Sequence, residues 1–149
     1  MNVEKVKIAV IGQGYVGLPL AIEFGKKHPT VGFDINKARI AALKKGNDHT
    51  NEATNEQLRS AHQLNFSAEI DDIKACNIYI VTVPTPIDEF KTPDLNPLRA
   101  ASQMLGEILK KGDLVIYEST VYPGCTEEVC VPLLEKSSKL IFNTDFYCG

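Results

Sequence analysis

Apolar and polar positions follow two patterns that alternate along the chain. Short apolar runs rich in β-branched residues indicate buried strands; they span Val6–Ile11, Thr30–Asp34, Leu64–Ser67, Asn77–Val83, Leu114–Thr120 and Leu140–Tyr147. Segments with helical spacing separate these runs; they span Tyr15–Lys27, Asn36–Lys45, Asn55–Gln63, Asp71–Ala75, Pro97–Lys111 and Thr126–Glu135. The alternation predicts an α/β fold, a Rossmann-like doubly wound and mainly parallel sheet with helices on both faces.

The first helical segment carries an apolar stripe. Val16, Leu20 and Phe24 recur at i, i+4 and i+8, and Gly17 and Ala21 lie on the neighbouring side that should face the sheet.

Two later helices have candidate starts. Asn96 is a candidate N-cap with Pro97 at the first helical position, and Thr126 is a candidate N-cap for the last helix. The polar segment Ile87–Asn96 is expected to be a loop at the rim of a site.

A glycine motif follows the first predicted strand. Gly12, Gly14 and Gly17 form Gly-x-Gly-x-x-Gly. Gly12 would allow a tight turn, Gly14 would let the backbone approach a pyrophosphate, and Gly17 would let the helix pack close to the sheet. The start of that helix would offer N–H groups to the phosphates.

An acid completes the dinucleotide pattern. Asp34 ends the second predicted strand, where a carboxylate can accept both hydroxyls of an adenosine ribose. The pattern predicts NAD binding, and a carboxylate there disfavours the 2′-phosphate of NADP. The alternative is a glycine turn in another kind of α/β unit.

Three more positions are candidates because ligands lie beyond the carboxyl ends of parallel strands. Thr85 follows one strand between two prolines, and Ser119 and Thr120 end another. The alternative for Thr85 is a solvent-facing hydroxyl on a stiff loop. Arg39 is either a solvated helix charge or a group that stacks near the adenine.

Composition narrows the function classes. The chain has 149 residues, 44% hydrophobic and 23% charged, with a net charge of −3. These values suit one globular domain and give no electrostatic case for nucleic acid or membrane partners. The charged start does not resemble a signal peptide, so a cytoplasmic location is expected. The four cysteines lack metal-site spacing, so reduced thiols and no metal are expected.

Three segments resemble the amino-terminal domain of the UDP-glucose/GDP-mannose dehydrogenase family. They are Gly12–Pro19, Val83–Pro86 and Glu118–Glu127. The stretch Tyr117–Glu128 and the ending Asp145–Tyr147 are most similar to the branch that oxidises C6 of UDP-N-acetylhexosamines, as in Vi-antigen polysaccharide synthesis.

The resemblance implies an NAD-dependent two-step oxidation of a sugar alcohol to a carboxylate. It places six of the residues around NAD: Tyr15, Val16, Asp34, Arg39, Thr85 and Thr120. It also places Thr120 near the reacting centre, where it helps to order a water, which makes Thr120 the candidate catalytic residue.

The family pattern continues beyond the length of this chain. Residues 1–149 are therefore interpreted as one NAD-binding domain of a longer enzyme, whose missing part would supply a catalytic cysteine, a lysine and most UDP-sugar contacts. Cys125 and Cys148 are expected to be bystanders. The fragment is expected to be inactive alone, and the full-length enzyme is expected to be a homo-oligomer.

Other functions stay open at this stage. The alternatives are a stand-alone NAD-sensing module, a UDP-glucose or UDP-N-acetylmannosamine 6-dehydrogenase, and a dehydrogenase of small hydroxy acids, against which the motif Glu118–Glu127 argues.

Overall fold

One parallel sheet organises the molecule. The computed structural model describes residues 5–87 and 89–149, so the first four residues of the predicted domain and residue 88 of the predicted rim loop lie outside it. The strands are β1 (Ile8–Ile11), β2 (Thr30–Phe33), β3 (Leu64–Ser67), β4 (Ile78–Val81), β5 (Leu114–Tyr117) and β6 (Tyr147–Cys148). Within the described residues their order is β3-β2-β1-β4-β5-β6 and each neighbouring pair is parallel, which confirms the predicted fold class.

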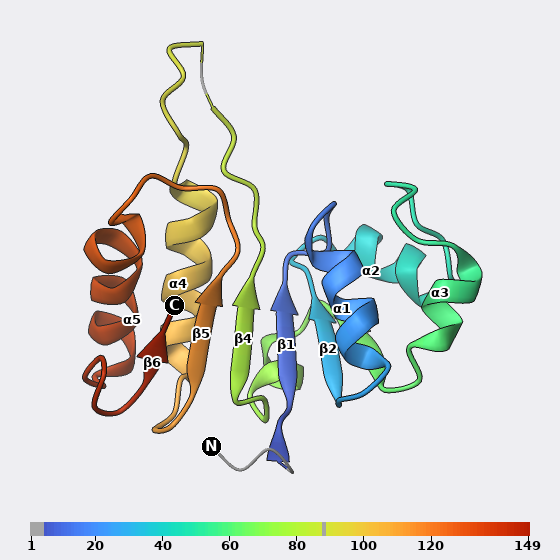
Figure 1. Cartoon of the computed structure of the whole chain (residues 1–149), viewed down its shortest axis with the longest axis horizontal. Coiled ribbons are helices and arrows are strands. Elements are labelled where there is room, and N and C mark those ends of the chain that lie inside the picture. Colours follow the sequence, from blue (N-terminus) through green and yellow to red (C-terminus); the bar gives the residue numbers. More distant parts are fainter. Residues whose placement is uncertain (1–4, 88) are drawn as a thin grey trace.

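Helices connect the strands and cover both faces of the sheet (Figure 1). The α-helices are α1 (Gly17–Gly25), α2 (Lys37–Lys44), α3 (Asn55–Ser60), α4 (Asn96–Ile108) and α5 (Val131–Ser138). A 3₁₀ turn, η2 (Ile70–Ile73), precedes β4, and a π-helical turn, η3 (Thr126–Cys130), leads into α5. None of the helices in the described ranges is long and apolar enough to cross a bilayer.

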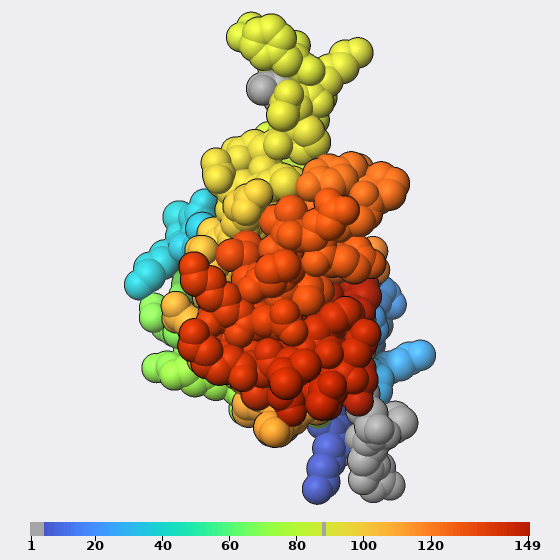
Figure 2. Space-filling model, turned by 90° about the vertical axis from the view of Figure 1, so that its left-hand side faces the viewer, coloured from blue at the N-terminus to red at the C-terminus, as the bar shows by residue number. Residues whose placement is uncertain are grey.

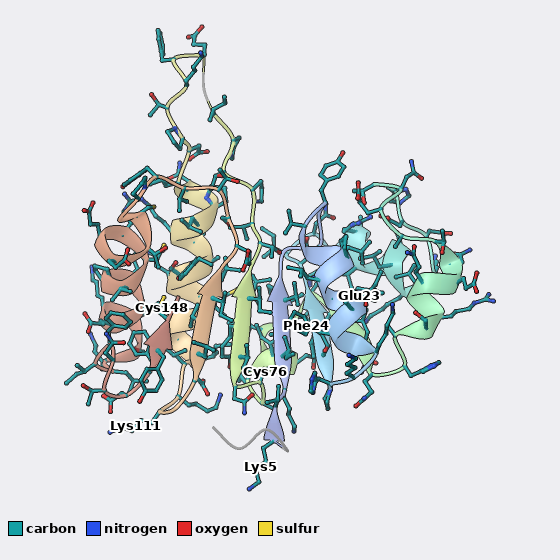
Figure 3. The ribbon with its side chains drawn as sticks, viewed as in Figure 1. Lys5, Glu23, Phe24, Cys76, Lys111 and Cys148 are labelled. Atoms are coloured by element: carbon teal, nitrogen blue, oxygen red, sulfur yellow. The ribbon has the colours of Figure 1, made fainter. Side chains whose placement is uncertain are left out.

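Successive side chains of β1 point to opposite faces of the sheet and pack in two different core clusters. Ala9 and Ile11 of β1 pack in the cluster that contains Leu105 of α4 and Leu134 of α5. The residues that alternate with them, Ile8 and Val10, pack on the opposite face with α1, where Phe24 is partly buried (Figure 3). Both faces of β1 are therefore buried, as its continuous apolar run requires.

The buried face of α1 agrees with the prediction at Gly17 and Ala21, and Leu20 and Phe24 are partly buried against the sheet, but Val16 departs from it. The buried side chains are Leu18, Ala21 and Ile22, whereas Val16 precedes the helix and is 49% exposed. Leu18 and Ile22 pack with Leu43 of α2, so α1 buries a flank against the next helices as well as its sheet side.

Both predicted N-caps are wrong. Asn96 is the first residue of α4, and its N–H donates to the carboxylate of Asp94 at 2.9 Å. Thr126 lies inside a π-helical turn whose N-cap, Cys125, makes no side-chain hydrogen bond.

The predicted last strand is also wrong over most of its length. Only Tyr147 falls in β6, and the residues before it form a turn. Asp145 closes this turn, because its N–H donates to the Ile141 carbonyl at 2.7 Å and its carboxylate accepts from the Ile141 N–H at 3.0 Å. The apolar pattern of the segment instead buries Phe146, which is 0% exposed.

Candidate functional site

A cleft opens at the carboxyl ends of β1 and β4, where the strand order reverses. Its volume is about 870 Å³. Most of the lining comes from the segments that follow four strands and from one side of α4, including Gly12–Val16, Asp34–Asn36, Thr82–Thr85, Glu118–Thr120 and Met104. Arg39 of α2 and Thr50 of the loop after α2 also line the cleft. A reversal of strand order is the place where open α/β sheets bind ligands.

The glycine loop forms the floor of this cleft. Gly12 turns the chain off β1 with φ +96°, which only glycine adopts without strain. A Cβ on Gly17 would lie 1.7 Å from the Gly12 carbonyl oxygen, so the start of α1 packs directly against the turn. The hydroxyl of Thr82 is 2.9 Å from the Ile11 carbonyl oxygen and 2.8 Å from that of Gly12, which ties the end of β4 to the same turn.

The cleft leaves room for an anion beside α1. A Cβ on Gly14 would meet nothing within 4 Å, and the residues Gly14–Val16 line the cleft. The first turn of α1 has no acidic residue, and Val16 at its N-cap makes no side-chain hydrogen bond. The positive end of the helix is therefore free to meet a phosphate group.

Asp34 is held in place by two backbone N–H groups. Gln13 donates to Oδ2 of Asp34 at 2.8 Å, and Asn36 donates to Oδ1 at 2.8 Å. The carboxylate therefore has a fixed orientation at the mouth of the cleft, next to Ile35, whose side chain is 81% exposed.

Gln13 is a residue that the sequence interpretation missed. Its side chain is fully buried, and its Nε2 donates to the Val10 carbonyl at 2.9 Å. Its Oε1 is buried without a hydrogen-bond partner among the described residues. The only sequence signal was its place between two glycines of the motif.

Arg39 is not a solvated helix charge. Its side chain is 10% exposed, and its Nε donates to the Gln13 carbonyl at 2.9 Å. Nη1 lies 2.7 Å from Oδ1 of Asp48, and Nη2 donates to the Thr50 hydroxyl at 3.2 Å. Arg39 thus joins the glycine loop to the loop after α2.

Asp48 organises that second loop. Its side chain is 1% exposed and accepts the N–H groups of Thr50, Glu52 and Ala53. Burial acts to raise the pKa of Asp48, but hydrogen bonds from Thr50, Arg39 and Ala53 outweigh it and hold that pKa well below its usual value. The polar composition of residues 47–55 gave no sign of a buried carboxylate.

The ends of β4 and β5 are tied across the cleft. The Thr85 hydroxyl donates to the Thr120 carbonyl at 2.7 Å, and the Ser119 hydroxyl donates to the Val83 carbonyl at 2.7 Å. Thr85 is therefore not a free hydroxyl on a stiff loop.

The predicted site residues converge, with one exception. Gly17 is not part of the lining and packs against the turn at Gly12. The other nine residues all line the cleft: Gly12, Gly14, Tyr15, Val16, Asp34, Arg39, Thr85, Ser119 and Thr120. The described residues of the predicted rim, 87 and 89–96, instead belong to an arm that projects from the body (Figure 2). The arm is held at its base by the N–H of Asp94, which donates to the Pro86 carbonyl at 2.7 Å.

The cysteines lie apart from the cleft lining. Cys76 adjoins the amino end of β4 and Cys148 lies on β6, which are separate parts of the sheet (Figure 3). Burial raises the pKa of Cys148 to about 12 and that of Cys76 to about 11, so both thiols are protonated at neutral pH. Within residues 5–87 and 89–149, no group of three or more His, Cys, Asp or Glu side chains is placed to hold a metal ion.

Comparisons with known proteins match this geometry. Residues 6–149 match the description "UDP-glucose/GDP-mannose dehydrogenase family, NAD binding domain". The chain is 60% identical over 148 residues to UDP-N-acetyl-D-glucosamine 6-dehydrogenase of Salmonella typhi, covering 99% of this chain and 35% of that protein. A protein of the same name from Pseudomonas aeruginosa is 61% identical over 144 residues, which are 97% of this chain and 34% of that protein.

Solved structures show the same fold. UDP-D-ManNAc dehydrogenase from Pyrococcus horikoshii superposes with a TM-score of 0.89 at 36% identity, covering 96% of this chain and 35% of that one. The chain thus spans about a third of the length of the relatives it matches. The match to an NAD binding domain confirms the cofactor expected from the sequence.

Proposed function

The chain belongs to the UDP-glucose/GDP-mannose dehydrogenase family, and we propose that it is the cofactor-binding half of an NAD-dependent UDP-N-acetylhexosamine 6-dehydrogenase. The whole enzyme would oxidise the C6 alcohol of the sugar to a carboxylate in two steps, for surface polysaccharide synthesis. Relatives of about 60% identity carry the name UDP-N-acetyl-D-glucosamine 6-dehydrogenase, which favours this branch over the UDP-glucose and UDP-N-acetylmannosamine alternatives.

The observation that carries the proposal is the cleft at the β1/β4 reversal. Its floor at Gly14 is open, the α1 start beside it is uncapped, and Asp34 offers a fixed carboxylate at its mouth. These three features fit a dinucleotide, because a pyrophosphate needs close backbone N–H groups and a ribose needs an acceptor for its hydroxyls.

Each residue then has a defined task. The Gly12–Gly17 turn would hold the pyrophosphate, Asp34 would bind the adenosine ribose, and the exposed Ile35 and Val16 would contact apolar ring faces. When bound, NAD supplies the acceptor for the hydride that leaves the sugar.

Thr120 is proposed as the catalytic residue of this half. It lies at the far side of the cleft, beyond β5, where Thr85 fixes its carbonyl and so its backbone position. Its hydroxyl would order a water near the reacting carbon. The nucleophile and most UDP-sugar contacts would come from a further domain, consistent with the pKa values of Cys76 and Cys148.

Calorimetry of the chain with millimolar NAD tests the proposal. We expect weak binding, a thermal shift in the presence of NAD, and no turnover by this chain alone. Absence of both heat and thermal shift would contradict the assignment. The parent reading frame separates this function from a stand-alone NAD-sensing module, because a downstream cysteine-bearing domain is required only by the dehydrogenase.

A further inference from the structure

Asp48 is a buried carboxylate that binds the one arginine of the cleft lining. We propose that Asp48 determines the choice between NAD and NADP, by holding Arg39 away from the 2′ position of the adenosine ribose. This inference rests on the proposed function, since it assigns a specificity role at the same cofactor site.

Arg39 lies in the cleft, close to the acid at the end of β2. It follows the strand-end acid Asp34 by five residues, and both residues line the cleft. Gln13 links the two, because its N–H donates to Asp34 and its carbonyl accepts from Arg39. In dinucleotide folds that use NADP, an arginine near this place accommodates the 2′-phosphate. Arg39 is thus within the region where such a phosphate would lie.

Each nitrogen of the Arg39 guanidinium already has a polar neighbour within the protein. Nε donates to the Gln13 carbonyl at 2.9 Å and Nη2 donates to the Thr50 hydroxyl at 3.2 Å. Nη1 lies 2.7 Å from Oδ1 of Asp48, in an ion pair. Asp48 therefore neutralises the charge that would otherwise attract a 2′-phosphate.

Asp48 cannot follow Arg39 toward a ligand. Its carboxylate is fixed by N–H groups at 3.0 Å from Thr50, 2.7 Å from Glu52 and 3.0 Å from Ala53. If Arg39 turned to a phosphate, it would leave a carboxylate that is 1% exposed without its cation, which is strongly unfavourable.

Two carboxylates would then select NAD by different means. Asp34 repels a 2′-phosphate directly. Asp48 pairs with Arg39, the nearby cation that would otherwise offset this repulsion. Lys37, a cation of the same helix, is 77% exposed and pairs with Glu69 on the surface, so it serves as the matched control.

The test is a double-mutant cycle read as the ratio of NADP to NAD affinity, measured by calorimetry on the chain. Asp34→Ser alone should raise this ratio modestly, because Arg39 stays bound to Asp48. Asp34→Ser with Asp48→Asn should raise it by a further ~10–100-fold, the range of one charge-assisted hydrogen bond. Adding Arg39→Gln should abolish that further gain, whereas adding Lys37→Gln should preserve it.

Several outcomes would overturn the inference. An equal ratio in the single and double variants would do so, as would a gain that survives Arg39→Gln or is lost with Lys37→Gln. If Asp48→Asn does not fold, Arg39→Gln in the Asp34→Ser background still decides: unchanged NADP affinity supports the inference and a clear loss contradicts it. Failure of the unaltered chain to bind NAD would instead contradict the proposed function.

Discussion

The hydroxyl of Thr85 donates to the backbone carbonyl of Thr120 at 2.7 Å, which joins two residues 35 positions apart at the ends of β4 and β5. The contact uses the side chain of one threonine and only the main chain of the other. The two hydroxyls can therefore be removed separately, with different expected results.

Replacing Thr85 by valine should destabilise the fold by about 0.5–1.5 kcal/mol, because the Thr120 carbonyl loses its donor. Thr120→Ala keeps that bond and removes only the hydroxyl proposed for chemistry. In the full-length enzyme we expect Thr120→Ala to lower kcat more than it weakens NAD binding. Urea unfolding and steady-state kinetics measure the two effects, and unaltered kinetics would remove Thr120 from the site.

Removing the Asp34 carboxylate should weaken NAD binding by about 1–3 kcal/mol, the loss of charge-assisted hydrogen bonds to the ribose. Asp34→Ala also frees the N–H groups of Gln13 and Asn36, so the glycine loop loses an anchor. Asp34→Asn is the control, because its amide oxygen can still accept one of them. An affinity for NAD that is the same in Asp34→Ala and the unaltered chain would refute the role.

Two glycines of one motif should respond differently to the same substitution. Gly17→Ala should destabilise the protein by about 1–3 kcal/mol or more, because the new Cβ would overlap the Gly12 carbonyl. Gly14→Ala has open space around its Cβ and should leave the melting temperature nearly unchanged, while the methyl group projects into the cleft and weakens NAD binding. Thermal unfolding and calorimetry of both variants distinguish stability from affinity. Equal melting temperatures for the two would argue against the packing described.

Asp48 should make stability depend on pH in the acid range. Its pKa is lower in the folded protein than its ordinary value of 3.8, so its stabilising effect is complete above that value and is lost as the pH falls through the folded pKa. Asp113 acts in the opposite direction, because burial raises its pKa. The informative quantity is therefore the difference between the unaltered chain and Asp48→Asn.

That difference should be about 1–3 kcal/mol near neutral pH and should shrink below pH ~4 as the unaltered chain loses its charged hydrogen bonds. Denaturant unfolding at a series of pH values measures it. A difference that stays constant down to strongly acid pH would show that the charge of Asp48 contributes nothing.

Local patterns in the sequence predicted the elements that depend on short-range rules. The glycine turn, β1 and α4 combine backbone geometry with regular apolar spacing, and all three lie close to the expected residues. The prediction of a strand over Leu140–Tyr147 was wrong, because most of this segment forms a turn that Asp145 closes. The contact between Asp145 and Ile141 cannot be recognised from the spacing of apolar residues.

The candidate site was predictable in part. Strand ends and the glycine motif identified the residues of the cleft, because topology alone brings these ends together. The partners of Arg39 were not predictable, since Asp48 lies in a polar stretch that resembles an ordinary surface loop. Its burial depends on how residues 47–55 fold back over α2, which is a tertiary arrangement.

The hydroxyl of Thr82 lies beside the last carbonyl of β1 and the carbonyl of the turn that follows it. The two halves of the sheet are consequently locked in longitudinal register at the seam between them. A slip of β4 along β1 would break this lock and would also alter the separation between the glycine loop and the end of β5. The Thr82 hydroxyl therefore adds to the main-chain ladder of β1 and β4 in setting the span over which any bound dinucleotide must stretch.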